Sequence, residues 1–132
     1  MTDRKLIDIA TGAMANSYSP YSRFKVGAAA ECTDGSIFTG CNIENAAFGA
    51  TMCAEAAAIA SAVSAGRRSF KRIAIISDGS AYCFPCGLCR QLLSEFSPEV
   101  EVLCARADGR YVSYPLTSLL PMAFGKEQKG NT

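Results

Sequence analysis

At 132 residues the chain is long enough for one domain with a substantial core and too short for two of ordinary size. We therefore expect a single domain over residues 1–132. Hydrophobic residues make up 49% of the chain and charged residues 19%, a balance typical of a folded globular protein. The formal net charge is +1 and no basic stripe is visible, which argues against a nucleic-acid partner and favours a small, roughly neutral molecule.

The N-terminal residues lack the apolar core of a signal peptide, and no apolar run approaches the roughly 20 residues of a membrane helix. We expect a cytoplasmic protein without membrane contact. In a reducing compartment, seven cysteines are better explained as metal ligands and buried thiols than as disulfides. Cys32, Cys41 and Cys104 lie in strand-like stretches and are interpreted as buried thiols.

The first half of the chain alternates helical and extended patterns. Apolar residues recur at spacings of three and four over residues 3–16, which predicts an amphipathic helix covering a sheet. Residues 24–32 and 37–41 are predicted to form a hairpin around an Asp-Gly turn. The alanine-rich stretch 51–65 predicts a helix packed on both sides, with Thr51 as its cap and Gly66 at its end.

The second half continues in the same way. A short apolar run at residues 71–77 predicts a buried strand, and residues 87–96 predict a helix. Two more strands are expected at 100–105 and 110–114, then a short helix over 115–124 and a frayed tail. This order predicts an α/β fold, a three-layer α/β/α sandwich around a mixed five-stranded sheet.

Two short motifs carry the chemistry of this chain. They read C-A-E at residues 53–55 and P-C-G-L-C at residues 85–89. A catalytic zinc ion keeps three protein ligands so that water can occupy the fourth position, and Cys53, Cys86 and Cys89 would supply three. Because the chain has no histidine, a general acid or base must come from another group, of which Glu55 is the best placed. The pair of motifs resembles the signature of zinc-dependent base deaminases.

The charge of such a site needs compensation. Three thiolates and one zinc ion sum to about −1, which makes bound water harder to deprotonate. Cys53 and Cys86 are each expected in the first turn of a helix, so that two positive helix N-termini offset this charge. Glu55 lies about 200° from Cys53 on an ideal helix. Its place beside the metal is therefore taken from the motif and not from helix geometry.

Structural alternatives remain open from the residues alone. Cys83 could complete a closed four-cysteine zinc site, and Cys83, Cys86 and Cys89 resemble part of an iron–sulfur run. Neither alternative requires Glu55 or the proline at position 85. A further alternative is a non-catalytic zinc module for protein or RNA contacts, which would hold zinc tightly without turnover.

Several other segments extend the likeness over almost the whole chain. They are S-Y-S-P-Y-S at 17–22, F-K-V-G-A-A at 24–29, G-C-N-I-E-N at 40–45, P-C-G-L-C-R-Q at 85–91 and L-L-P-M-A-F-G at 119–125. With C-A-E they resemble the small homotetrameric cytidine deaminases. The resemblance implies a cytidine deaminase-like fold, one Zn²⁺ per subunit and a homotetramer with its sites at subunit interfaces.

The resemblance also implies the reaction. A hydrolase of this kind converts cytidine and 2′-deoxycytidine to uridine and 2′-deoxyuridine plus ammonia, in pyrimidine salvage. Zinc-bound hydroxide would attack C4 of cytosine while Glu55 shuttles protons. Ala56 stands where many members have an arginine directly after C-A-E. Compensation of the thiolate charge is then expected from the helix N-termini and from Arg90 behind the ligands.

Substrate contacts follow from the same resemblance. It assigns Asn42 and Glu44 to the ribose hydroxyls, Phe24 to stacking on the pyrimidine and Ala54 to substrate contact. Phe124 is assigned to a neighbouring subunit's site. A deaminase for a cytosine-bearing antibiotic nucleoside such as blasticidin S would share the zinc core, but Asn42 and Glu44 favour an ordinary ribose.

Overall fold

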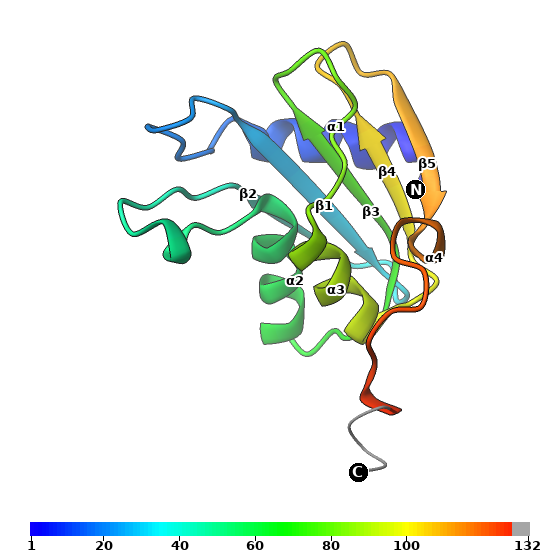
Figure 1. Ribbon diagram of the computed structural model, residues 1–132. Helices are drawn as coiled ribbons and strands as arrows, with labels where there is room; N and C mark the ends of the chain where they lie inside the picture. Colours follow the sequence, from blue (N-terminus) through cyan, green and yellow to red (C-terminus); the bar gives the residue numbers. More distant parts are fainter. Residues whose placement is uncertain (128–132) are drawn as a thin grey trace.

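The computed structural model describes residues 1–127. A mixed sheet in the order β2-β1-β3-β4-β5 has α1 on one face and α2 and α3 on the other (Figure 1). The strands are β1 (Val26–Cys32), β2 (Ile37–Cys41), β3 (Phe70–Ser77), β4 (Glu101–Ala105) and β5 (Tyr111–Pro115). The helices are α1 (Asp3–Met14), the short 3-10 turn η1 (Phe48–Ala50), α2 (Ala54–Ser64), α3 (Gly87–Phe96) and α4 (Leu116–Leu119). The predicted three-layer sandwich is confirmed.

The sheet contains both parallel and antiparallel strand pairs. Strands β3 and β4 are parallel, and α3 provides the crossover that a parallel pair requires. Every other neighbouring pair is antiparallel. The predicted hairpin of β1 and β2 is present, and Gly35 takes the positive φ of +89° that its Asp-Gly turn demands.

Small residues allow the helices to lie close on the sheet. Alternate alanines of β1 face opposite sides, so that Ala28 belongs to the core beneath α2 and Ala29 to the core beneath α1. At Gly40 a Cβ atom would lie 2.4 Å from the Ala54 carbonyl oxygen and 2.5 Å from the Ala58 nitrogen. The start of α2 is therefore in contact with the backbone of β2.

Two helix boundaries differ from those expected. Helix α2 begins at Ala54, because Met52 pairs with Ile43 in extended conformation and the Thr51 hydroxyl accepts a hydrogen bond from the Asn45 N–H instead of capping the helix. Helix α4 ends at Leu119 and not at residue 124. Pro121 disfavours helical conformation in the residue before it and cannot donate a helical hydrogen bond. Residues 128–132 of the expected tail lie outside the described residues.

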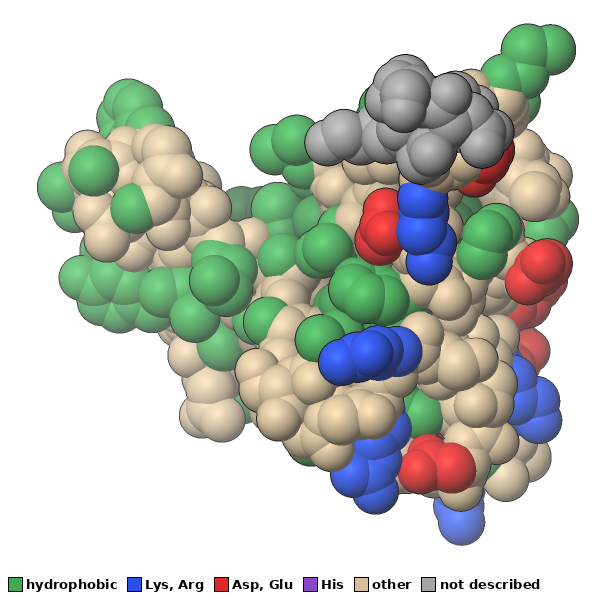
Figure 2. Space-filling model, turned by 90° about the horizontal axis from the view of Figure 1, so that it is seen from below, with side chains coloured by type: hydrophobic (Ala, Val, Ile, Leu, Met, Phe, Trp, Pro, Cys, Tyr) green, Lys and Arg blue, Asp and Glu red, His purple; other side chains and the backbone are tan. Residues whose placement is uncertain are grey.

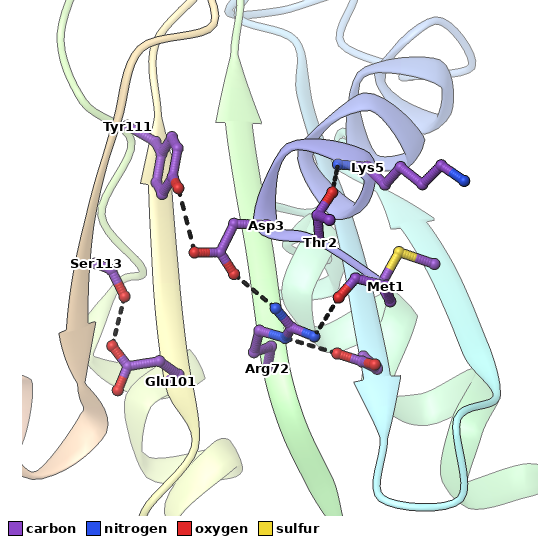
Figure 3. A network of polar contacts seen from close by, with 9 residues as sticks. Met1, Thr2, Asp3, Lys5, Arg72, Glu101, Tyr111 and Ser113 are labelled. Carbon is purple, nitrogen blue, oxygen red and sulfur yellow. Dashed lines mark hydrogen bonds and ion pairs between the residues drawn. The ribbon is translucent and has the colours of Figure 1, made fainter.

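A polar network fixes the N-terminus on the α1 side of the sheet (Figure 3). Arg72 on β3 donates to Glu31 on β1 and to Asp3 of α1, both at 2.7 Å, and to the Met1 carbonyl at 2.9 Å. Asp3 also accepts a hydrogen bond from the Tyr111 hydroxyl at 3.2 Å. These acidic partners raise the pKa of Arg72, which keeps the arginine charged in its largely buried position. Across residues 1–127 no helix has the length and apolar character needed to cross a membrane.

Candidate active site

The two helices on one face of the sheet begin at cysteines. Cys53 is the N-cap residue of α2 and Cys86 is the N-cap residue of α3, each with extended backbone angles and no capping hydrogen bond from its side chain. Both cysteines therefore lie directly before the first helical residue and not within the first turn, where the sequence had placed them. Cys89 lies in the first turn of α3. The three sulfur atoms meet where two positive helix ends converge.

The spacing of the sulfur atoms fits a zinc ion. The Sγ atoms of Cys53, Cys86 and Cys89 all lie within 4.8 Å of one another, and those of Cys53 and Cys86 are 3.7 Å apart. A disulfide would require about 2.05 Å. Zinc–sulfur bonds of about 2.3 Å give a tetrahedral edge of about 3.8 Å. Three thiols at this spacing fit zinc and leave one tetrahedral position for another ligand.

Cys83 does not join this cluster. Among residues 1–127 the only cysteines close enough together to hold a metal are Cys53, Cys86 and Cys89. Burial raises the pKa of Cys83 to about 12, and its thiol hydrogen-bonds to Ser77. The geometry therefore favours the open three-cysteine site over the closed four-cysteine alternative.

The thiols share negative charge unevenly. The pKa of Cys53 is lowered to about 6, first because the Cys89 thiol donates a hydrogen bond to its sulfur, and the Cys86 thiol adds a second such bond. The pKa of Cys89 is raised, because it is the donor of that bond and is itself buried. The first of the three thiols therefore deprotonates readily, whereas deprotonation of the others is opposed by the charge already present. A bound divalent cation would stabilise all three as thiolates.

Glu55 lies beside the cluster with its side chain almost wholly buried. Burial raises its pKa to about 7, and the negative charge of Cys53 adds to the effect. Hydrogen bonds from its own backbone N–H and from the Cys89 thiol act in the opposite direction. Because Cys53 precedes the helix in extended conformation, the 200° separation of an ideal helix does not apply. Both side chains therefore reach the same cavity.

The cavity at this site has a volume of about 230 Å³. Its lining combines two of the three clustered cysteines, the buried carboxyl and most of the residues assigned to substrate. They are Phe24, Val26, Asn42, Glu44, Thr51, Met52, Cys53, Ala54, Glu55, Cys83, Phe84 and Cys86. Apolar walls with a few convergent polar groups are typical of a small-molecule site. Phe124 is absent from this lining and is 57% exposed.

Three chain segments are bound together beside the cavity. Tyr18 donates its N–H to the Asn42 carbonyl and accepts from the Glu44 N–H, at 3.0 and 2.8 Å. Ile43 and Met52 exchange two backbone hydrogen bonds of 2.9 Å. The segment that ends at Cys53 is thereby aligned with the segments that carry the predicted sugar contacts.

The side chain of Asn42 makes several hydrogen bonds to other parts of the chain. Its Nδ2 donates to the Phe24 carbonyl at 2.7 Å, while its Oδ1 accepts from the Val26 N–H at 3.0 Å and from the Ser17 hydroxyl. Both lone pairs of the amide oxygen are then engaged, and one amide hydrogen remains. Asn42 therefore holds the backbone on either side of Lys25 as well as facing the cavity.

Arg90 and Gln91 connect the metal-bearing helix to the C-terminal segment. Arg90 donates to the carbonyl of Pro85 at 2.8 Å and to that of Leu119 at 2.7 Å. Gln91 donates to the carbonyl of Phe124 at 2.9 Å. The hydrogen bonds of the Arg90 guanidinium thus go to backbone oxygens, one of them directly before the ligand Cys86.

Sequence reasoning missed some of the residues that line the cavity. Four of them flank the two cysteine motifs: Thr51, Met52, Cys83 and Phe84. Their closeness in sequence to the predicted ligands could have indicated that they line the site. Phe84 also packs against Tyr114, with ring centroids 6.2 Å apart. Val26, at the start of β1, carried no chemical signal.

The fold and the site together define a zinc-dependent deaminase of the kind that acts on a nucleobase: three thiols at two helix N-termini, with a buried glutamate in the same cavity. Residues 1–105 match the family model described as "Cytidine and deoxycytidylate deaminase zinc-binding region". The chain belongs to the cytidine deaminase family.

Individual relatives agree with this assignment. The chain is 44% identical over 128 residues to a cytidine deaminase of Sporosarcina psychrophila, covering 96% of this chain and 94% of the relative. The crystal structure of cytidine deaminase from Burkholderia pseudomallei has a TM-score of 0.91 and 42% identity, covering 94% of this chain and all of that one. A blasticidin-S deaminase of Bacillus cereus is 33% identical over 130 residues, covering 92% of this chain and 91% of the relative.

Proposed function

We propose that this protein is a zinc-dependent cytidine deaminase, which hydrolyses cytidine and 2′-deoxycytidine to the corresponding uridines and ammonia in pyrimidine salvage. The observation that carries the proposal is the cavity that brings Glu55 beside Cys53 and Cys86, two of the three zinc ligands. We propose further that residues 1–132 act as one catalytic domain and that the protein works in the cytoplasm.

The chemistry divides between the metal and the chain. When bound, zinc supplies a Lewis acid that allows water to act as a nucleophile near neutral pH. Glu55 would accept one proton from that water and pass it to N3 of the base. It would then carry the remaining proton of the same oxygen to the amine, which leaves as ammonia when the C4–N bond breaks and the C4 carbonyl forms. In the metal-free chain burial raises the pKa of Glu55 to about 7, and burial of the carboxyl favours a group that both accepts and releases protons near neutral pH. Burial excludes bulk water from the transfer.

The remaining residues of the cavity hold the nucleoside. Phe24 provides the face against which the pyrimidine stacks, and Ala54 lies in the wall next to the ligand Cys53. Asn42 and Glu44 lie in the same lining and supply hydrogen-bonding groups for the ribose hydroxyls. This arrangement supports an ordinary ribonucleoside as the substrate.

We also propose a homotetramer in which Phe124 completes the site of a neighbouring subunit. Phe124 is outside the cavity of its own chain, and that cavity is smaller than the roughly 300–1,000 Å³ of most small-molecule sites. Large hydrophobic side chains are strongly exposed, with Phe48 at 82%, Leu88 at 83% and Met122 at 103%. Hydrophobic side chains gather on the projection at the left of Figure 2. Exposed apolar surface of this kind is typical of protein interfaces.

Replacement of the proposed proton carrier tests the function. We expect Glu55→Gln to lower kcat for cytidine by about 100- to 10,000-fold, because the buried amide cannot transfer the proton. Conversion is followed by the loss of ultraviolet absorbance, and zinc content is measured on the same samples. The matched control is Glu99→Gln at an exposed position, which should leave turnover unchanged.

Three other outcomes would contradict the proposed function or part of it. Near-normal turnover in Glu55→Gln would contradict the role of Glu55. An intact protein that holds zinc and converts blasticidin S but not cytidine would instead assign it to antibiotic nucleosides. Zinc without turnover of either substrate would indicate a structural zinc module.

A further inference from the structure

The Ser22 hydroxyl lies between two predicted substrate contacts, Glu44 and Phe24. It donates a hydrogen bond to Oε2 of Glu44, and it accepts one from the Phe24 N–H at 3.0 Å. Because an ionised carboxylate can only accept, the hydroxyl hydrogen must point to Glu44. The bonds therefore run in one direction, from the Phe24 backbone through Ser22 to the carboxylate.

The other oxygen of Glu44 is held by backbone. Oε1 accepts from the N–H groups of Tyr21 and Ser22, each at 3.0 Å. A carboxylate has about four acceptor positions, two on each oxygen. Within the described residues, these three donors leave one acceptor position of Glu44, and it lies on the oxygen that the Ser22 hydroxyl holds. The direction in which that remaining position points is set by Ser22.

The charge of Glu44 fits this arrangement. The Ser22 hydroxyl is the largest cause of a lowered pKa at Glu44, and the backbone N–H groups of Ser22 and Tyr21 add to it. The carboxylate is thus kept ionised and acts only as an acceptor. A substrate hydroxyl, which can donate, is the matching partner, and hydrogen bonds to an ionised acceptor are about twice as strong as neutral ones.

We propose that Ser22 is a positioning residue for sugar recognition: its hydroxyl orients the free acceptor of Glu44 toward a ribose hydroxyl and links that contact to the backbone of the stacking residue Phe24. The inference rests on the proposed function and deepens it. Ser22 does not touch the reacting atoms, and its effect is exerted through Glu44. It should therefore appear as a change in discrimination between nucleosides with and without sugar hydroxyls.

The test compares kcat/KM for cytidine with kcat/KM for 2′,3′-dideoxycytidine. We expect Ser22→Ala to lower the ratio of the two by about 10-fold, which corresponds to the loss of one charge-assisted hydrogen bond. A general displacement of Phe24 affects both nucleosides and cancels in the ratio. Ser22→Thr keeps a hydroxyl and should keep the ratio within about 3-fold. Ser22 is exposed, so neither variant removes core packing.

The chain offers a matched control at the opposite end of β1. Ser36 donates its hydroxyl and its N–H to Asp34 in the same manner, and it lines no part of the substrate cavity. Ser36→Ala should leave the ratio unchanged. In a Glu44→Gln background, Ser22→Ala should have no further effect on the ratio, because both changes remove the same contact.

The outcomes separate the two proposals. If wild-type protein converts cytidine and Ser22→Ala leaves the ratio unchanged, or still lowers it in the Glu44→Gln background, the role of Ser22 is overturned. If wild-type protein does not convert cytidine, the proposed function fails instead. A lower ratio in Ser22→Ala, restored in Ser22→Thr, supports the inference.

Discussion

At position 55 a carboxyl group is only 4% exposed and faces a set of sulfur atoms that themselves carry negative charge. Ionising such a group costs free energy in the folded state. In the unfolded chain there is no such cost, because the carboxyl is exposed to water. Glu55 therefore destabilises the metal-free protein whenever it is charged. The same raised pKa suits it to the proposed proton transfer, so stability and the proposed activity place opposite demands on this residue.

The pH dependence of stability follows from the direction of this shift. With a pKa raised from 4.5 to about 7, the folded state binds more protons than the unfolded state between these values. The contribution of Glu55 to the free energy of unfolding is thus fully favourable below about pH 4.5 and is lost as pH rises through 7. In metal-free protein, we expect Glu55→Gln to be more stable than wild type at pH 8, by on the order of 3 kcal/mol.

Urea titrations in the presence of a chelator measure this difference. At pH 4.5 the two proteins should have nearly the same free energy of unfolding, because neither folded protein then carries a charge at position 55. A difference that does not change between pH 4.5 and 8 would show that Glu55 is not the group responsible.

On the scale of elements, the site depends on how closely α2 approaches β2. Cys53 and Glu55 lie at the beginning of α2, and the position of this helix is set by direct contact between its backbone and Gly40. Ala54, Ala58 and Ala62 of α2 are buried in the core and permit this close approach. The expected packing on both sides of the helix was wrong, because Ala60 and Ser61 are exposed. Packing against the sheet therefore determines where Cys53 and the proposed proton carrier Glu55 are placed.

A single methyl group at this contact should be disruptive. Gly40→Ala puts Cβ within 2.5 Å of two backbone atoms of α2, which must shift. We expect a loss of about 1–3 kcal/mol in stability and lower zinc affinity, because Cys53 moves with the helix. Chemical denaturation and metal competition measure the two effects. Gly12→Ala is the control: a Cβ there meets nothing within 4 Å, and alanine should stabilise α1 by about 0.5–1 kcal/mol.

On the scale of the whole molecule, Phe124 lies outside the substrate cavity of its own chain, and the segment that carries it is hydrogen-bonded to α3. Gln91 holds the backbone of Phe124 while the ring remains exposed, and Arg90 anchors the start of the same segment at Leu119. Both donors follow directly after the ligand Cys89. This arrangement supports an assembly in which one subunit's metal-bearing helix presents Phe124 to the next subunit.

Mixing of inactive subunits tests that assembly. We expect Phe124→Ala and Glu55→Gln each to have low activity, and hybrids of the two to regain part of it, because an intact Glu55 site can then receive Phe124 from its neighbour. Light scattering should give four times the 13.9 kDa mass of the chain. A monomeric mass, or hybrids no more active than their parents, would contradict the proposed tetramer.

The sequence determined most of the architecture, because helix and strand periodicity and turn residues act locally. The hairpin at Gly35 and the alanine-rich helix formed where expected. The two wrong boundaries have different causes, a distant contact at the start of α2 and a local proline at the end of α4. Thr51 failed as a cap because its segment pairs with Ile43, and α4 stopped at Leu119 ahead of a proline.

The sequence by itself also predicted which three cysteines cluster and which carboxyl group lies beside them, because the C-A-E and P-C-G-L-C motifs restrict which chemistry these residue types can perform. Only the tertiary structure decided how Cys53 and Glu55 reach one cavity, since that depends on a cysteine in extended conformation directly before the helix. The same is true of Ser22, whose partner is 22 residues away along the chain. A motif specifies which groups are present, whereas hydrogen-bond partners distant in sequence are set by the packing of segments that fold together.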